Sequence, residues 1–172
     1  MVLIGYSGHA FVVYGIFKAA GKNVMGYCDV AEKTYNPFGL PYVGTENSET
    51  GLDAIKASGY FIAVGDNKLR KKIYEALQKN NLSSTNAIHP SAVIDSSANI
   101  ATQGVMIAAN VTINPLAFIA TGAICNTGCI VEHECAVGEF AHIGPRAVLC
   151  GNVKLVQVVL LVPMPLSGRV SQ

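Results

Sequence analysis

Residues 113–149 read INPLAF-IATGAI-CNTGCI-VEHECA-VGEFAH-IGPRAV-L, a run in which an aliphatic or small apolar residue opens every block of six. The same repeat extends from Ile88 to Leu155, and only the seven-residue step from Ile100 to Ile107 departs from it. An α-helix would repeat at about 3.6 residues and a simple strand at about 2, so neither explains a period of six.

Short strands joined by tight corners do explain this period. A second small residue comes four places after each aliphatic, as at Ala117, Ala123 and Cys129, and it fits beside a corner. The pattern is typical of a parallel β-helix built from hexapeptide repeats. Three hexads complete one triangular coil, so residues eighteen apart are expected to stack at about 4.8 Å, the spacing of paired strands.

The composition favours a globular protein that binds neither nucleic acid nor a membrane. The 172 residues carry a net charge of +1, and only 13% of them are charged. Such a balance gives no basic surface for nucleic acid, and the low charge suggests that one face is buried between subunits. No cleaved signal opens the chain, and the longest apolar stretch, 158–166, is interrupted by Pro163 and Pro165. We therefore expect a soluble, cytoplasmic protein.

The five cysteines predict neither disulfides nor a metal site. They include no CxxC pair, and their number is odd. Cys125, Cys129 and Cys135 hold repeat positions that carry Ile, Ala or Val in other coils. They are interpreted as small interior side chains rather than as metal ligands or nucleophiles.

Residues 1–82 lack the hexad and alternate strands with helices. Apolar strand segments are expected at 2–4, 24–28 and 60–64, and helices at 10–20 and 68–79. This alternation predicts a small Rossmann-like parallel sheet with ligands at the carboxyl ends of its strands. The loop 31–48 is expected to be irregular. The chain thus divides into an α/β front domain, 1–82, and an all-β solenoid, 83–155.

Polar residues gather at the expected strand ends. Gly5-x-Ser7-x-x-Ala10 is a partial dinucleotide fingerprint, whose turn would expose N–H groups to a phosphate. Asp29 ends the second strand and could accept a hydrogen bond from a ribose or sugar hydroxyl. A plain strand-to-helix turn with a capping serine explains the same residues.

Basic side chains also gather on the helix expected at 68–79. Lys68, Arg70, Lys71 and Lys72 are expected to form a solvated face of this helix.

The segment Glu132-His133-Glu134 carries the clearest chemistry, because the corners of other coils hold Ala, Asn, Thr or Gly. A neutral imidazole whose other N–H is held by a carboxylate is a suitable general base near pH 7. Gly151 lies eighteen residues after His133 and should stack one coil above it. A glycine there leaves room beside the ring and bares an N–H for an oxyanion.

These segments together resemble the NeuD/PglD family of sugar acyltransferases, and the resemblance covers nearly the whole chain up to Leu155. The matching elements are the opening VLIGYSGH, the FIAVGDN segment before RKKIY, and the run IVEHECAVGEFAHI. The resemblance implies a homotrimer of left-handed parallel β-helices. It also implies acetyl-CoA bound between neighbouring solenoids and a nucleotide-linked amino sugar held by the front domain.

The resemblance also implies roles for individual residues. His133 looks like the catalytic base, Glu134 like the carboxylate that raises its basicity, and Gly151 like the oxyanion donor. His142 looks like a contact to acetyl-CoA. The implied contacts to the sugar nucleotide are Ser7, Gly8, His9, Asp29 and Gly65. Direct attack of an amine or hydroxyl on the thioester needs no acyl-enzyme, since Cys135 sits at an interior position.

The hexads decay after Leu155, where Val156 and Val162 replace turn residues. If one guanine were lost after the Leu155 codon, restoring it permits the reading GTSGSIGANAFVWQGVS, which resumes the repeat. We therefore hypothesise that 156–172 is an aberrant, frameshifted tail. The coils it replaces would contact acetyl-CoA, so the chain could instead be a catalytically weak or inactive sugar-nucleotide-binding trimer. Sequencing of the gene tests this hypothesis.

Three other functions compete with the acyltransferase. The first is a nucleotide-binding module whose solenoid only assembles trimers. The second is an NAD-dependent enzyme, favoured by Asp29 but weakened by the incomplete glycine fingerprint. The third is a metal hydratase, which needs three converging histidines, whereas His89, His133 and His142 are poorly spaced for that purpose.

Overall fold

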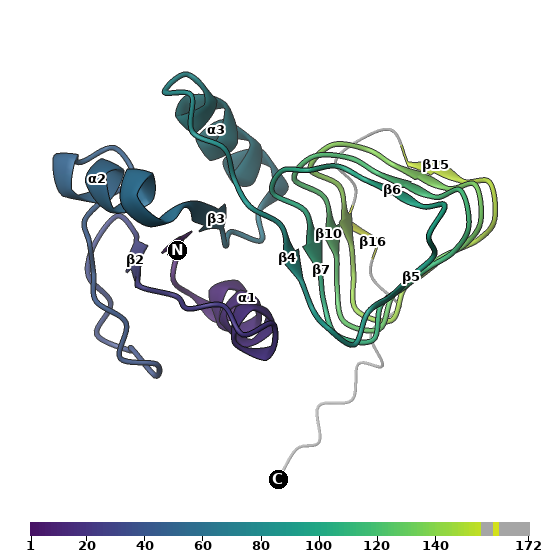
Figure 1. Cartoon of the computed structure of the whole chain (residues 1–172), viewed down its shortest axis with the longest axis horizontal. Helices are drawn as coiled ribbons and strands as arrows, with labels where there is room; N and C mark the ends of the chain where they lie inside the picture. The colour runs from purple at the N-terminus through teal and green to yellow at the C-terminus, as the bar shows by residue number, and fades with distance from the viewer. Residues whose placement is uncertain (156–159, 162–172) are drawn as a thin grey trace, which may run out of the picture.

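The fold is described from a computed structural model, which covers residues 1–155 and the strand Leu160–Leu161 (Figure 1). The front domain has three parallel strands in the order β2-β1-β3: β1 (Val2–Ile4), β2 (Gly26–Cys28) and β3 (Tyr60–Ile62). Its helices are α1 (Gly8–Ala19), α2 (Glu49–Ser58) and α3 (Asn67–Gln78). The expected parallel sheet is confirmed, and α2 is an element that the sequence analysis missed.

Alternating side chains of these strands build two apolar layers. Leu3, Tyr27 and Phe61 point to the face that α1 covers, where they are buried with Val13 and Phe17. The other apolar side chains of the strands point to the opposite face and pack with Ile55 of α2 and Leu77 of α3. They are Val2, Ile4, Cys28, Tyr60 and Ile62. A sheet buried on both faces explains why all three strands are apolar throughout.

The solenoid consists of two-residue strands. They are β4 (Ala87–Ile88), β5 (Val93–Ile94), β6 (Asn99–Ile100), β7 (Met106–Ile107), β8 (Thr112–Ile113), β9 (Phe118–Ile119), β10 (Ile124–Cys125), β11 (Ile130–Val131), β12 (Ala136–Val137), β13 (His142–Ile143), β14 (Val148–Leu149), β15 (Lys154–Leu155) and β16 (Leu160–Leu161). Each hexad aliphatic is the second residue of a strand. This confirms the parallel β-helix and agrees with the left-handed form that the family resemblance implies.

The strands stack into three parallel sheets, one on each side of a triangular coil (Figure 1). Their orders are β16-β13-β10-β7-β4, β14-β11-β8-β5 and β15-β12-β9-β6. Partners such as Cys125 and Ile143 are eighteen residues apart. Ile88 pairs with Ile107, nineteen residues on, so the extra residue between Ile100 and Ile107 is absorbed without breaking the stack.

One residue in the left-handed region of φ recurs at every sixth position. These residues are Gly104, Asn110, Leu116, Gly122, Gly128, Glu134, Phe140, Arg146 and Asn152. For residues other than glycine this conformation costs about 1–2 kcal/mol. The corner N–H groups offset part of it, since that of Glu134, for example, donates to the Pro115 carbonyl of the coil below (3.0 Å). The repeat thus fixes both the corner and the direction of its side chains.

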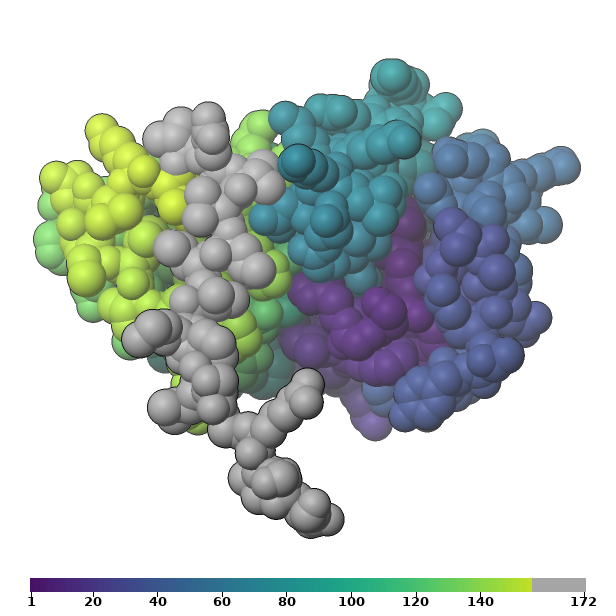
Figure 2. Space-filling view, turned by 180° about the vertical axis from the view of Figure 1, so that it is seen from behind, coloured from purple at the N-terminus to yellow at the C-terminus, as the bar shows by residue number. Residues whose placement is uncertain are grey.

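We call β16-β13-β10-β7-β4 the joint sheet, because the front domain packs on it. The outward residues Ala87, Met106 and Ile124 are at most 1% exposed, and α1 lies directly against β4. Figure 2 shows the front domain, coloured purple through blue to teal, in close contact with the green and yellow solenoid. The other two sheets keep outward apolar side chains exposed, including Val93 (65%) and Val148 (55%).

Arg70 of α3 fastens the two domains and is 1% exposed, so the expected solvated position of this residue is wrong. Its five N–H donors all have acceptors, which are the carbonyls of Gly122 (3.0 Å), Phe140 (2.8 Å), Val64 (3.0 Å) and Gly65 (3.1 Å) and Oδ1 of Asn67 (2.8 Å). Burial lowers the pKa of Arg70 to about 10, so the guanidinium stays charged at neutral pH. Lys68, Lys71 and Lys72 are exposed, as expected.

The hypothesised frameshift falls on 156–172, which lies outside the described residues except for Leu160–Leu161. The strand β16 pairs with β13, so Leu161 still follows the six-residue repeat. Within residues 1–155 and 160–161, no helix combines the length and apolarity needed to span a bilayer.

We predict that Arg70→Met lowers the free energy of unfolding by about 3 kcal/mol or more. Methionine fills much of the volume but leaves buried carbonyls of both domains without a donor, each at a cost of about 1–3 kcal/mol. Urea unfolding followed by circular dichroism measures the change. Lys72→Met on the same helix is the control, because Lys72 is exposed. Equal stability of the two variants would contradict the role of Arg70.

Candidate functional site

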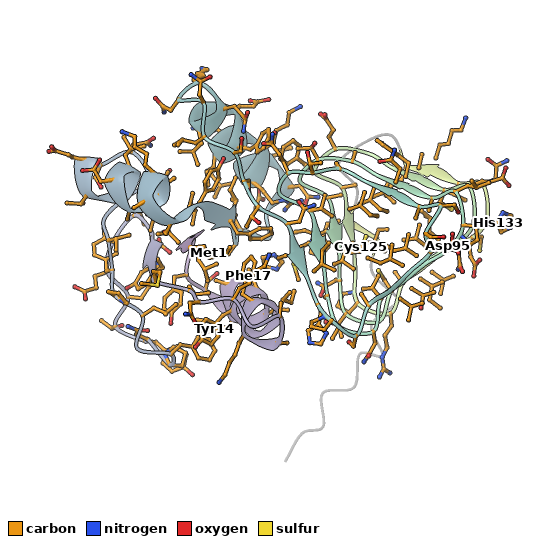
Figure 3. The ribbon with its side chains drawn as sticks, in the orientation of Figure 1. Met1, Tyr14, Phe17, Asp95, Cys125 and His133 are labelled. Carbon is orange, nitrogen blue, oxygen red and sulfur yellow. The ribbon has the colours of Figure 1, made fainter. Side chains whose placement is uncertain are left out.

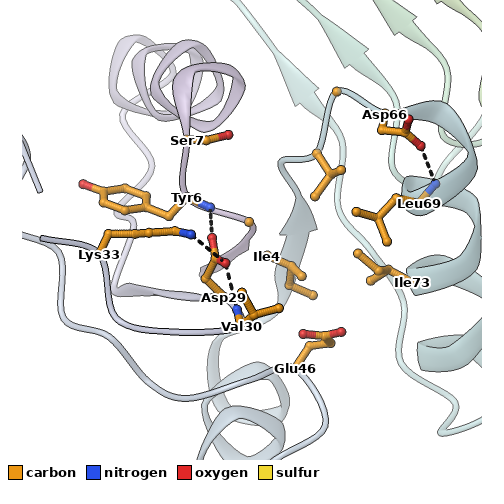
Figure 4. Close-up of a pocket in the computed structure, with 13 residues that line it drawn as sticks. Ile4, Tyr6, Ser7, Asp29, Val30, Lys33, Glu46, Asp66, Leu69 and Ile73 are labelled. Carbon is orange, nitrogen blue, oxygen red and sulfur yellow. Dashed lines mark hydrogen bonds and ion pairs between the residues drawn. The ribbon is translucent and has the colours of Figure 1, made fainter. Parts of the chain in front are cut away.

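A cavity of about 410 Å³ opens at the carboxyl ends of all three front-domain strands (Figure 4). Its lining includes Ile4, the last residue of β1, Ser7 in the turn that follows, Asp29 after β2 and Gly65 after β3. The predicted ligand edge of the sheet is therefore hollow, and it gathers three of the five residues expected to contact a sugar nucleotide. Gly8 and His9 do not line this cavity.

Asp29 organises one wall of the cavity (Figure 4). Its carboxylate accepts hydrogen bonds from the N–H groups of Tyr6 (2.9 Å) and Val30 (2.7 Å) and pairs with Lys33 (2.9 Å). The first of these bonds ties the end of β2 to the turn after β1. Asp29 is thus a support of the glycine turn as well as a cavity residue.

The turn itself leaves donors open at the start of α1. Ser7 occupies the N-cap, but its hydroxyl makes no capping hydrogen bond and is exposed. The first helical N–H group with a backbone acceptor is that of Phe11, which donates to Ser7 (3.1 Å). Gly5 has φ +88°, and a Cβ there would lie 2.7 Å from Val64, so the turn requires glycine. An open helix start of this kind favours an anionic ligand.

His9 and His142 meet at the domain joint behind this turn, with ring centroids 6.1 Å apart. His142, on β13, is 9% exposed, and its Nε2 lies 3.1 Å from Nδ2 of Asn126. An amide nitrogen only donates, so Nε2 accepts and the ring is neutral. Gly65 lies beside the His9 ring as well as the cavity, since it lines the cavity and a Cβ built on it would lie 3.7 Å from that ring.

Burial is the main reason why both joint histidines resist protonation. Desolvation, helped by the nearby Arg70 cation, lowers the pKa of His9 and that of His142 from 6.5 to about 4. The Nε2 atom of His9 is buried and has no hydrogen-bond partner among the described residues. Uncharged rings therefore pack beside a buried guanidinium without repelling it.

The predicted stack at the solenoid corner is present. His133 follows β11, and Gly151 lies above it, so that a Cβ built on Gly151 would be 2.6 Å from Nε2 of His133. Nδ1 of His133 lies 3.2 Å from a carboxylate oxygen of Glu134. The His133 side chain is 59% exposed and lies on the outside of the coil (Figure 3). One ring nitrogen of His133 therefore faces a carboxylate, and the other lies next to Gly151, which has no side chain.

The cavity and His133 lie on opposite sides of the folded chain. His133 follows β11 and precedes β12, at the vertex of the triangular coil that lies across from the joint sheet. Figure 3 shows it far from the front domain. His133 therefore lies at the vertex across from the joint sheet, whereas His142 lies on β13 within that sheet.

In the part of the chain that the structure describes, no group of three or more His, Cys, Asp or Glu side chains is arranged to hold a metal ion. Cys125, Cys129 and Cys135 are buried in the solenoid, as predicted. The sequence analysis missed Arg70 and the support that Asp29 gives to the turn. Neither contact has a local sequence signal, because each joins segments more than twenty residues apart.

Comparison with known proteins points to one class of enzyme. Residues 1–77 match the PglD N-terminal domain family. GDP-perosamine N-acetyltransferase (PerB) from Caulobacter crescentus, in complex with CoA and GDP-perosamine, is 38% identical with a TM-score of 0.79, and the match covers 89% of this chain and 72% of that chain.

The acetyltransferase domain of PglB from Neisseria gonorrhoeae, in complex with acetyl coenzyme A, is 29% identical with a TM-score of 0.79. That match covers 89% of this chain and 74% of the other. WeeI from Acinetobacter baumannii, at 19% identity over 89% of this chain and 73% of the other, shares the fold with a TM-score of 0.75.

We predict that stability falls as the pH is lowered from about 6.5 to about 4. In this pH window His9 and His142 bind protons in the unfolded chain but not in the folded chain. The free energy of unfolding therefore decreases as the pH falls, by up to about 1.4 kcal/mol per pH unit for each ring. Above pH 7 both states are neutral and this contribution vanishes. Urea unfolding across the pH range measures the slope.

The matched variant is His142→Asn, which keeps a polar side chain but cannot titrate. The free energy of unfolding of this variant should depend less on pH between about 6.5 and 4, by the equivalent of about one proton. At pH 7.5, where the histidine is neutral in both states, the stability of the variant should differ less from that of the parent chain. Parallel curves for the parent and the variant would show that burial of His142 does not set the acid sensitivity.

Proposed function

The chain belongs to the NeuD/PglD family of sugar acyltransferases, and we propose that it transfers the acetyl group of acetyl-CoA to the amino group of a nucleotide-linked sugar. The observation that carries this proposal is the corner stack, in which His133 lies between the Glu134 carboxylate and Gly151. The 38% identity to an enzyme named for N-acetyl transfer to GDP-perosamine favours an amine over a hydroxyl as acceptor.

His133 serves as the general base in this proposal. When Nδ1–H donates to Glu134, Nε2 keeps its lone pair and can take a proton from the attacking amine. The carboxylate also stabilises the imidazolium that results. The amine nitrogen first bonds to the thioester carbonyl carbon and gives a tetrahedral intermediate. The C–S bond of that intermediate then breaks, the carbonyl re-forms, and the proton passes from His133 to the departing CoA thiolate.

Gly151 serves as the oxyanion donor. The tetrahedral intermediate places negative charge on the former carbonyl oxygen, and a backbone N–H beside the base can bind that charge. The absence of a side chain at 151 lets the thioester approach the imidazole closely, because even one methyl group would lie 2.6 Å from Nε2.

The front-domain cavity holds the nucleotide-linked sugar in this proposal. Its negatively charged phosphates suit the open start of α1, where Ser7, Gly8 and His9 present a free hydroxyl and backbone donors. Asp29 and Gly65 also line the cavity and can contact ribose or sugar hydroxyl groups. The cavity volume of about 410 Å³ lies in the ordinary range for small-molecule sites.

The complete site then requires a neighbouring copy, since the cavity and His133 lie at opposite ends of one chain. We place the sugar on one subunit and the base on the next, in a homotrimer, with acetyl-CoA between adjacent solenoids. The exposed apolar Val93 and Val148 next to this vertex suit such an interface. In this arrangement His142 can contact acetyl-CoA only if the corner of the neighbouring chain that carries His133 lies against the cavity near Gly65.

We predict that His133→Ala lowers kcat at least about 100-fold, because general-base catalysis contributes about 10²–10⁴. Glu134→Gln should lower kcat less, because it weakens the base without removing it. Release of free CoA thiol from acetyl-CoA, dependent on a nucleotide-linked amino sugar, measures the rate. Cys135→Ser should keep most of the activity, and loss of activity in that variant with a normal His133→Ala enzyme would overturn the assignment.

Mixed trimers test whether subunits share the site. Two single variants are mixed. Ser7→Tyr blocks the cavity, and it removes no capping hydrogen bond because the Ser7 hydroxyl makes none. His133→Ala removes the base and leaves the cavity intact. After equal mixing, unfolding and refolding, about a quarter of the sites would pair an intact cavity with an intact base, as a cyclic trimer requires. Mixtures as inactive as both parents would place the whole site within one chain.

We also predict that Gly151→Ala lowers kcat at least about tenfold with little loss of stability. The added methyl group must push the exposed His133 ring aside, and small misplacements of catalytic groups reduce rates strongly. Thiol release and thermal unfolding measure the two effects. Gly15→Ala is the control, because a Cβ at Gly15 meets nothing within 4 Å. Normal activity of Gly151→Ala would exclude a thioester seated at this glycine.

A further inference from the structure

We infer that the buried thiol of Cys135 is a positioning residue for acetyl transfer, which aims the Gly151 N–H by holding the carbonyl of Cys150. The inference rests on the proposed function, because it concerns the oxyanion donor of that site. It assigns Cys135 a part in catalysis without a covalent bond to substrate, and it differs from the interior filler that the repeat predicts.

The geometry begins with the peptide group between Cys150 and Gly151. Sγ of Cys135 lies 3.1 Å from the Cys150 carbonyl oxygen, a short distance for a thiol donor. Cys135 is 1% exposed, inside the coil, so this carbonyl points inward. The peptide bonds of the described chain are trans, and in a trans peptide the N–H points opposite to the C=O. The Gly151 N–H is therefore directed outward.

Outward is the side on which the catalytic base lies. The Cα of Gly151 faces the His133 ring, because a Cβ built there would be 2.6 Å from Nε2. Among the residues that the structure describes, the Gly151 N–H has no hydrogen-bond acceptor. A donor that is unpaired and fixed beside the base is the arrangement that oxyanion stabilisation needs.

The thiol is not needed to fill the corner. Ala117 holds the same repeat position one coil below Cys135 and is also buried, so the solenoid closes there with a methyl group. Cys129 offers a matched comparison, because it is a second buried thiol and Ala147 holds its repeat position one coil above. No backbone carbonyl accepts a hydrogen bond from Cys129 in the described part of the chain.

The thiol acts on the donor in two ways. It restrains rotation of the peptide plane, and by donating to the carbonyl it increases the positive charge on the N–H at the other end of the same group. Both effects operate in the transition state, when the oxyanion forms, and hardly at all on the bound thioester. Loss of the thiol should therefore reduce kcat and leave KM almost unchanged.

Kinetics of three variants test this inference. Cys135→Ala should lower kcat about five- to tenfold with KM for acetyl-CoA and for the sugar nucleotide within about twofold. Cys135→Ser should restore kcat to within about twofold of the parent, because a hydroxyl also donates. Cys129→Ala, which removes the other buried thiol, should match the parent in kcat. Thermal unfolding should change by similar amounts in Cys135→Ala and Cys129→Ala.

A spectroscopic readout separates this inference from the proposed function. Cys150–Gly151 is the only Cys-Gly step in the chain, so labelling with [1-¹³C]Cys and [¹⁵N]Gly gives one cross-peak in an HNCO spectrum. That peak reports the Cys150 carbonyl and the Gly151 N–H together. It should move in Cys135→Ala, stay near the parent position in Cys135→Ser, and be unchanged in Cys129→Ala.

Each result decides between distinct conclusions. An unmoved cross-peak in Cys135→Ala, or equal kcat values for the Cys135→Ala and Cys129→Ala enzymes, would overturn the role of the thiol. A moved peak with no acetyl transfer by the parent chain to any nucleotide-linked amino sugar would retain the contact but reject the proposed function, and with it the catalytic meaning of Cys135.

Discussion

The buried guanidinium of Arg70 is the contact on which the rest of this structure depends. It reaches from α3 to the carbonyls of Gly122 and Phe140, which occupy the same corner of successive coils. The other end of its fork holds Val64 and Gly65, which form the edge of the front-domain cavity. A single planar cation thereby sets the distance from the ligand edge of one domain to the coils of the other. Tyr74, whose hydroxyl donates to Gln103 (3.1 Å), supports the same joint.

The solenoid supplies the second constraint, because its repeat stacks every residue above a fixed partner. The column that contains His133 has Pro115 below and Gly151 above, so the environment of the imidazole is set by residues eighteen positions away on either side. The neighbouring column holds Glu134 in a left-handed conformation (φ 59°). This left-handed conformation recurs at every corner from Gly104 to Asn152 and is therefore a property of the repeat. What distinguishes this corner is the choice of side chains that the repeat displays.

Regularity decides how much of this protein could be predicted from its sequence. The hexads fix each two-residue strand of the solenoid, and simple counting places Gly151 over His133, because each step is local and periodic. The strand ends likewise place Asp29 and Gly65 at one edge of the sheet. The position of Arg70 could not be predicted, since the lysines around it on α3 are exposed and four of its five acceptors are main-chain carbonyls, which any residue type provides. The burial of His142 was hidden for the same reason, as the repeat does not show which sheet a second domain covers.

The joint and the repeat together explain why rigidity is needed at the contact between the domains. In the proposed trimer each chain contributes to two sites, because its cavity faces one neighbour and its His133 faces the other. A shift at the joint would therefore move the sugar acceptor away from the His133 base, which belongs to a different chain. An apolar joint would give similar burial but little directional restraint, because dispersion contacts change slowly with rotation. The guanidinium of Arg70 instead donates two directed hydrogen bonds to the solenoid, at Gly122 and Phe140, and three to the front domain, so it restrains rotation between the two domains. The neutral His9 and His142 rings then complete the joint without a second charge, so its geometry is sensitive to acid and insensitive to pH near neutrality.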